Sequence, residues 1–166
     1  MKKVYFIIPL VLGAFGCAEV EKQIEEDSKK EVLNTFKVEL VKSLPSPSVS
    51  EDPEGVSITQ DEMTYTLNKA EILLGDLDDD YEPDVVYSVT IHPGGNIEDK
   101  KHYAVLTSLG SQVELALGSN SVITGVSGKD ILVTSFEWTE EDARCCPSIT
   151  TAKKFSYIGN KFVQIN

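Results

Sequence analysis

One short acidic stretch carries the residues best suited to chemistry. GDLDDDYEPD begins at Gly75 and places aspartates at loop positions 1, 3, 5 and 9. Ca²⁺ takes about six to eight oxygen ligands, and alternate carboxylates can wrap one ion when a main-chain carbonyl completes the loop at position 7. We therefore predict a Ca²⁺ site made of Asp76, Asp78, Asp80, Glu82 and Asp84. The alternative is an exposed acidic turn, which Asp, Gly and Pro also favour.

The spacing D-x-D-x-D-x-x-x-D resembles the calcium loops of FG-GAP (integrin-type) repeats and related extracellular β-proteins. An EF-hand is excluded because position 12 is Tyr87 instead of a bidentate Glu, and no helical pattern flanks the loop. FG-GAP-like loops usually carry Gly at position 6, where this chain has Tyr81. A non-glycine residue in the left-handed conformation costs energy, so this position bears on the affinity of the loop.

A second chemical feature is the pair Cys145-Cys146, followed by Pro147. Adjacent Cα atoms lie about 3.8 Å apart across a trans peptide, below the usual disulfide range of about 4.4–6.8 Å, so a vicinal bridge would be strained and easily reduced. Two free thiols at a turn are the alternative. A soft-metal site that adds His92 and His102 would require the fold to bring these side chains together.

The start of the chain has the organisation of an export signal. MKKVYFIIPLVLGAFGC has a basic start, a short apolar run and small residues before Cys17. Gly16-Cys17 resembles the lipobox of bacterial lipoproteins, which implies cleavage after residue 16 and a lipid on the Cys17 sulfur. We predict a signal peptide over 1–16 and a membrane anchor at Cys17. Ordinary signal cleavage after Gly16 or Ala18 is the alternative.

Composition limits the classes of partner. The chain of 166 residues is long enough for one domain, and 27 acidic against 15 basic residues give a formal charge of −12. Nucleic acid and anionic membrane surfaces are poor partners because binding phosphate requires a basic surface. Divalent cations are better ones.

Two segments of different composition precede the predicted domain. Residues 17–55 form a leader in which a charged segment has partly helical apolar spacing, so a helix within residues 20–42 and a flexible tether are both possible. The Pro- and Ser-rich residues 45–55 are predicted to be a linker. From residue 56 to 166 the composition is that of a β-rich domain.

The β-rich part shows short runs of Val, Ile, Thr, Tyr and Phe between turn residues. No strand–helix–strand rhythm appears, which argues against a parallel α/β enzyme fold. We predict a mainly β antiparallel meander, curled or sandwiched, with strands at residues 63–67, 71–74, 85–92, 102–109, 112–117, 121–126, 131–138, 150–157 and 161–165.

Two separated motifs, the acidic loop leading into Asp84-Val85-Val86-Tyr87 and the later Arg144-Cys145-Cys146-Pro147, resemble those of a group of uncharacterised bacterial envelope lipoproteins. The resemblance covers about residues 70–165. It implies a fold and a location in the bacterial cell envelope, lipid-anchored at the outer membrane on either its periplasmic or its surface face. It implies no activity.

No enzyme motif is present: phosphate loops, dinucleotide fingerprints, H-E-x-x-H and the G-x-S-x-G elbow are all missing. We therefore expect a lipid-anchored, Ca²⁺-stabilised binding or structural module whose partner is an envelope protein or a glycan, and not an enzyme. The alternatives are a redox or metal-handling lipoprotein that uses Cys145 and Cys146, and an unrecognised hydrolase.

Overall fold

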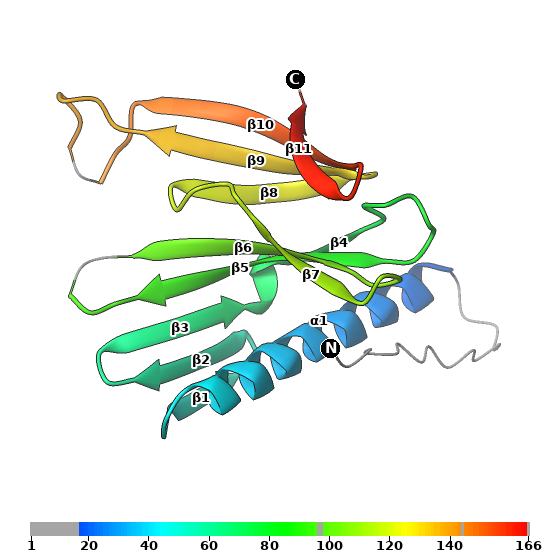
Figure 1. Cartoon of the computed structure of the whole chain (residues 1–166), viewed down its shortest axis with the longest axis horizontal. Helices are drawn as coiled ribbons and strands as arrows, with labels where there is room; N and C mark the ends of the chain where they lie inside the picture. The colour runs from blue at the N-terminus through cyan, green and yellow to red at the C-terminus, as the bar shows by residue number, and fades with distance from the viewer. Residues whose placement is uncertain (1–16, 96–97, 144, 166) are drawn as a thin grey trace.

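The computed structural model describes residues 17–95, 98–143 and 145–165, so the predicted signal peptide over 1–16 lies outside the described residues. The described chain forms three layers: a four-stranded sheet, a seven-stranded sheet and one long helix against the outer face of the larger sheet (Figure 1). All strand pairs are antiparallel. The predicted mainly β antiparallel fold with an N-terminal helical segment is confirmed.

Helix α1 (Cys17–Ser43) is part of the folded unit. Its side chains Val32, Leu33 and Phe36 share one face and pack against buried residues of the seven-stranded sheet. Two ion pairs also join the helix to this sheet: Lys69–Glu26 at 2.5 Å and Lys37–Glu51 at 2.8 Å. The predicted helix is confirmed, whereas a flexible tether is wrong for these residues because the sheet covers the apolar face.

The seven-stranded sheet has the order β1-β2-β3-β5-β6-β7, with β4 also paired to β5. Strand β5 shares one edge between two partners, since β4 pairs with its first half and β3 with its second half. A short 3-10 turn, η1 (Lys69–Glu71), separates these partners. The strands are β1 (Ser48–Asp52), β2 (Gly55–Gln60), β3 (Met63–Asn68), β4 (Ile72–Gly75), β5 (Asp84–His92), β6 (Asp99–Leu106) and β7 (Ser111–Leu115).

Strand β1 lies inside residues 45–55, which the composition predicts to be a linker. It pairs with β2 over its whole length, and the Asp52 carboxylate accepts the N–H groups of Glu54 (2.8 Å) and Gly55 (3.0 Å) in the connecting turn. Every side chain of β1 is exposed. The linker prediction is therefore wrong for these residues, because backbone pairing at a sheet edge needs no apolar side chains. The β-structure begins at Ser48.

The four-stranded sheet has the order β11-β10-β9-β8 and follows the chain as a meander. A register shift between Ile123 and Gly125 marks an irregularity in β8. The β9–β10 connection, which carries Cys145 and Cys146, projects from one end of this sheet (Figure 1). The strands are β8 (Ser121–Ser127), β9 (Asp130–Glu137), β10 (Ile149–Ile158) and β11 (Lys161–Ile165).

Two apolar cores lie on opposite faces of the seven-stranded sheet. Between the sheets, Val86 and Ala104 pack with Ile131 and Val133 of β9, and on the helix side Val85, Tyr87 and Val89 pack beneath α1. Strand β5 serves both cores because successive side chains point to opposite faces. Its first seven residues are all buried. The predicted metal ligand Asp84 is thus the first residue of a strand anchored on both sides.

Candidate metal centre

The acidic loop connects two paired strands, so both of its ends are held. Gly75 is the last residue of β4 and Asp84 the first of β5, and these two residues face each other in the strand register. A Cβ atom at Gly75 would overlap the Val126 side chain of β8, so only glycine fits where the loop begins. The sheet therefore holds the start and the end of the loop side by side.

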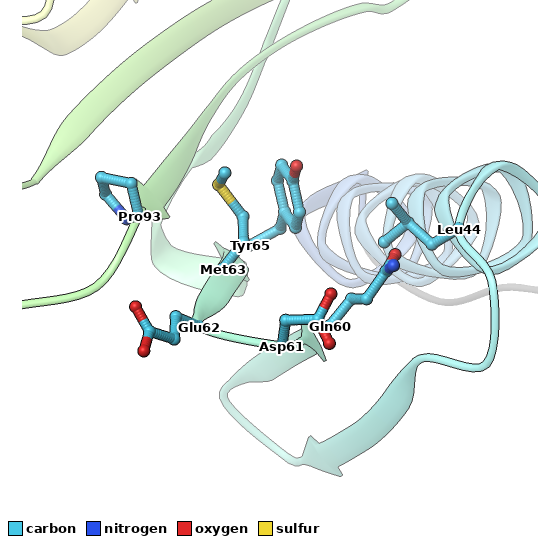
Figure 2. A pocket seen from close by; sticks show the side chains of 7 residues that line it. All are labelled: Leu44, Gln60, Asp61, Glu62, Met63, Tyr65 and Pro93. Carbon is cyan, nitrogen blue, oxygen red and sulfur yellow. The ribbon is translucent and has the colours of Figure 1, made fainter.

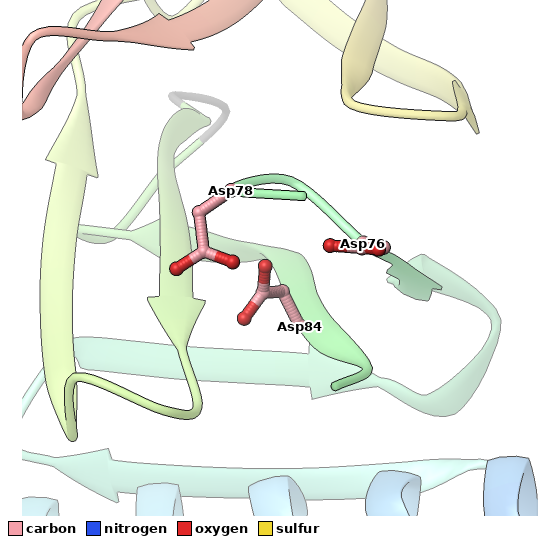
Figure 3. Close-up of side chains that lie close together, drawn as sticks. All are labelled: Asp76, Asp78 and Asp84. Carbon is pink, nitrogen blue, oxygen red and sulfur yellow. The ribbon is translucent and has the colours of Figure 1, made fainter. Parts of the chain in front are cut away.

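Three of the five predicted ligands converge. Asp76, Asp78 and Asp84 each offer a carboxylate oxygen, and these oxygens all lie within 4.8 Å of one another. Figure 3 shows the carboxylates of Asp78 and Asp84 facing each other across the loop, with Asp76 beside them. This is the one cluster of three or more His, Cys, Asp or Glu ligands found among the side chains that the structure describes.

Asp84 is the buried member, with no exposed surface. Its Oδ2 accepts the N–H of Leu77 and its Oδ1 accepts the N–H of Thr107, both at 2.8 Å. Burial raises the pKa of the Asp84 carboxyl to about 6, although the two backbone hydrogen bonds act in the opposite direction. Asp84 therefore ties the acidic loop to the β6–β7 turn, and its charge is costly unless a cation lies near.

Asp78 carries an oxygen without a protein partner. Its Oδ2 accepts a hydrogen bond from the Ser108 hydroxyl at 3.3 Å, whereas its Oδ1 is shielded from solvent and bonds to no described residue. Desolvation raises the pKa of the Asp78 carboxyl, and the nearby charge of Asp80 raises it further. An acceptor atom in this condition is suited to a metal ion, which supplies both charge and coordination.

Asp76 shapes the turn. Its carboxylate accepts the N–H groups of Asp80 (3.0 Å) and Tyr81 (3.1 Å). The turn places Asp79 and Tyr81 in the left-handed region, with φ of 67° and 68°. The Tyr81 side chain is 93% exposed, so no packing offsets the strain at this position. The loop therefore adopts the conformation that glycine would favour at position 6, with tyrosine in its place.

The remaining two predicted ligands, Asp80 and Glu82, lie outside this cluster. The Asp80 carboxylate accepts the N–H of Glu82 at 2.8 Å. Hydrogen bonding from the Ser108 hydroxyl, and after it from the Glu82 N–H, lowers the pKa of Asp80. Coordination by the Glu82 main chain stays a prediction. Thr107 and Ser108 of the β6–β7 turn were not predicted as part of the site, and no feature of the sequence links them to residues 75–84.

Among the residues that the structure describes, no cluster of three or more metal ligands includes a cysteine or a histidine. Cys145 and Cys146 are exposed free thiols in the β9–β10 loop, which the Asp142 carboxylate closes by accepting the N–H groups of Thr139 (2.8 Å) and Ser148 (2.9 Å). A bridge between the two thiols remains a prediction, since it depends on the redox state.

His102 begins the strand predicted at residues 102–109 and lies within the observed β6. It is 1% exposed within β6, where its Nδ1 lies 2.8 Å from the Ser88 hydroxyl, and burial lowers its pKa. Ser88 is also buried, at 4% exposure. This serine–histidine pair is therefore closed to a substrate from solvent and contributes to the packing between the two sheets.

Membrane-spanning segments and similarity to known proteins give no further information about this site. Among the described residues, no helix is both long and apolar enough to cross a bilayer. A scan of protein-family models and searches of curated proteins and of solved structures found no match to this chain.

Proposed function

We propose that this chain is a lipid-anchored envelope protein in which Ca²⁺ bound by Asp76, Asp78 and Asp84 stabilises a β-rich binding module. One observation carries the metal assignment: three carboxylates converge, and one of them, that of Asp78, has a shielded oxygen that bonds to no described residue. Carboxylate oxygens are hard ligands, which suit Ca²⁺ and Mg²⁺ and not thiophilic metals. Ca²⁺ is favoured because it accepts irregular coordination, whereas Mg²⁺ requires a near-octahedral set.

The role of the ion in this proposal is structural. Asp84 joins the loop to the β6–β7 turn, and Asp78 joins it to Ser108 of the same turn. An ion among these carboxylates would screen their mutual repulsion and hold the two connections together. The proposed ion thus stabilises one end of the seven-stranded sheet without a part in any reaction.

A melting experiment tests the metal assignment. Ca²⁺ at about 100 times its dissociation constant should raise the midpoint by roughly 5–10 °C relative to chelator, from a stabilisation of about 2.7 kcal/mol. Asp78→Asn should abolish most of this shift. Asp79→Asn is the matched control, because Asp79 has the same charge in the same loop but lies outside the cluster. An unchanged midpoint in wild-type protein would refute the proposal.

The anchor is the second part of the proposal. Helix α1 begins at Cys17 and packs on the sheet, so a lipid on Cys17 would attach to the folded unit without an intervening tether. The lipobox-like Gly16-Cys17 supports this modification. Expression in a bacterium fed an alkyne-labelled fatty acid should label the wild-type chain. Cys17→Ser should abolish the label, and a labelled Cys17→Ser chain would contradict the assignment.

A second candidate function is redox or soft-metal chemistry at Cys145 and Cys146. The observation that favours it is that both adjacent thiols are exposed on a loop that projects from the smaller sheet (Figure 1). Soft thiolate ligands suit Cu⁺ and Zn²⁺. Titration of the native thiols, described below, separates a reduced pair from a bridged one.

A further inference from the structure

An open cavity lies at the end of the molecule where α1 stops. Its volume is about 320 Å³, and it is bounded by Leu44 just after the helix, by the β2–β3 turn and by Pro93 after β5. Figure 2 shows Met63 and Tyr65 rising from β3 between Pro93 and the end of the helix, with Asp61 and Gln60 beside them. Three separate elements therefore form the walls.

The charged groups in this cavity are all acidic. Asp61 and Glu62 line it, no Lys, Arg or His does, and neither carboxylate forms an ion pair with any residue that the structure describes. The Gln60 Oε1 atom is shielded from solvent and accepts no hydrogen bond from the described residues. The carboxyl end of α1 adds the negative pole of the helix dipole. The cavity is thus suited to a cation that donates hydrogen bonds.

A larger groove continues from this cavity, lined mostly by apolar and aromatic side chains together with Glu39 and Lys101. Met63 and Tyr65 line both spaces, and the second, of about 660 Å³, runs beside α1 past Phe36, Leu40 and Tyr103. The aromatic ring of Tyr65 lies where the acidic and apolar parts join, and aromatic rings attract cations as well as apolar groups. A matching ligand therefore has a cationic end and an apolar body.

We propose that this groove binds a partner protein through a segment in which a lysine or arginine is followed by apolar residues. The basic side chain enters the acidic cavity, and the apolar side chains lie along α1. A cavity of about 320 Å³ is at the small end of ligand sites, which suits one side chain. The charge of −12 on the chain favours the approach of a basic partner.

The acidic cavity is remote from the proposed metal centre, whereas the groove that continues from it extends along β5 to Tyr87. Strand β5 runs from Asp84 in the metal cluster to His92 beside Pro93, a separation of about 27 Å along an extended strand. Binding of the segment therefore requires no Ca²⁺. Measurements made in chelator test peptide binding by the groove alone. A failed binding proposal can therefore be distinguished from a failed metal assignment.

The test is a titration of the full folded domain with a defined peptide, acetyl-Lys-Leu-Phe-Leu-amide, followed by amide NMR shifts in chelator. Shifts should concentrate at Leu44, Met63 and Tyr65. The same peptide with glutamine in place of lysine should bind about tenfold more weakly, because it lacks the charge that two exposed carboxylates recognise. Equal affinity of the two peptides, or no shift at these residues, would overturn the proposal.

Variants locate the effect. Asp61→Asn and Glu62→Gln should each weaken the lysine peptide about two- to fivefold, the range for exposed ion pairs. Asn tolerates the positive φ of 54° at position 61, so the turn is retained. Glu140→Gln, in the distant β9–β10 loop, is the control and should change nothing. Butylammonium that binds as tightly as the peptide would overturn the assignment to a protein segment.

Discussion

Replacement of Asp84 by Asn tests the buried carboxylate through the pH dependence of stability. Burial raises the pKa of the Asp84 carboxyl in the folded chain to about 6, from an ordinary value of 3.8. Between these pH values the folded state binds a proton that the unfolded state lacks, so stability falls as pH rises through this window. The fully ionised group costs folding about 3 kcal/mol. Asp84→Asn has no such titration.

The variant also loses hydrogen bonding. Both Asp84 oxygens accept backbone N–H groups at 2.8 Å, and an amide nitrogen cannot accept, so one buried N–H is left unpaired at a cost of about 1–3 kcal/mol. At pH 4 in chelator the Asp84 carboxyl is protonated in the folded state and its hydroxyl oxygen accepts less well, so we expect the wild type to be more stable by at most this amount. From pH 4 to pH 7 the difference should shrink by about 2.4 kcal/mol, so that the variant approaches or exceeds the wild type.

Urea unfolding at a series of pH values in chelator measures this difference, and comparison with the variant removes the contribution of other carboxyl groups. Asp79→Asn is the control, with the same change of charge at an exposed loop position. Saturating Ca²⁺ at pH 7 should stabilise the wild type but not Asp84→Asn, so that the wild type is again the more stable of the two. A wild-type minus variant difference that stays constant within about 0.5 kcal/mol from pH 4 to 7 would refute a desolvated Asp84.

Three further predictions follow from strain, packing and thiol exposure. Tyr81→Gly should raise the free energy of unfolding by up to about 1 kcal/mol in melts made in chelator, because the left-handed strain of about 1–2 kcal/mol exceeds the entropy cost of glycine. Tyr81→Ala is the control, because alanine keeps the Cβ atom that causes the strain. An equal gain in stability for Tyr81→Ala would contradict this explanation. Deletion of residues 17–43 uncovers the apolar face around Leu67 and should abolish cooperative unfolding by circular dichroism, whereas a retained transition would make α1 dispensable. Thiol titration without reductant of the Cys17→Ser variant, which lacks the third cysteine, should find two reactive groups, Cys145 and Cys146, and a value of zero would indicate a bridge.

Most of the β-structure could be predicted from local pattern. The predicted strands from Met63 onward correspond to β3 to β11 with ends shifted by a few residues, because alternation and turn residues act over short distances. The two strands before them were missed. β1 has only exposed side chains, and its order comes from pairing with β2, which composition does not report.

For the candidate metal centre, too, the sequence predicts some features and only the structure shows the others. Sequence spacing by itself determined that Asp76, Asp78 and Asp84 belong to one acidic loop between two strands, since that follows from adjacency in the chain. Only the tertiary structure decided which carboxylates converge, that Asp84 is fully buried, and that Thr107 and Ser108 complete the surroundings. These features depend on the pairing of β5 with β6, which brings together residues more than twenty positions apart. Burial and desolvation belong to that packed arrangement, so the spacing of the aspartates alone could not reveal them.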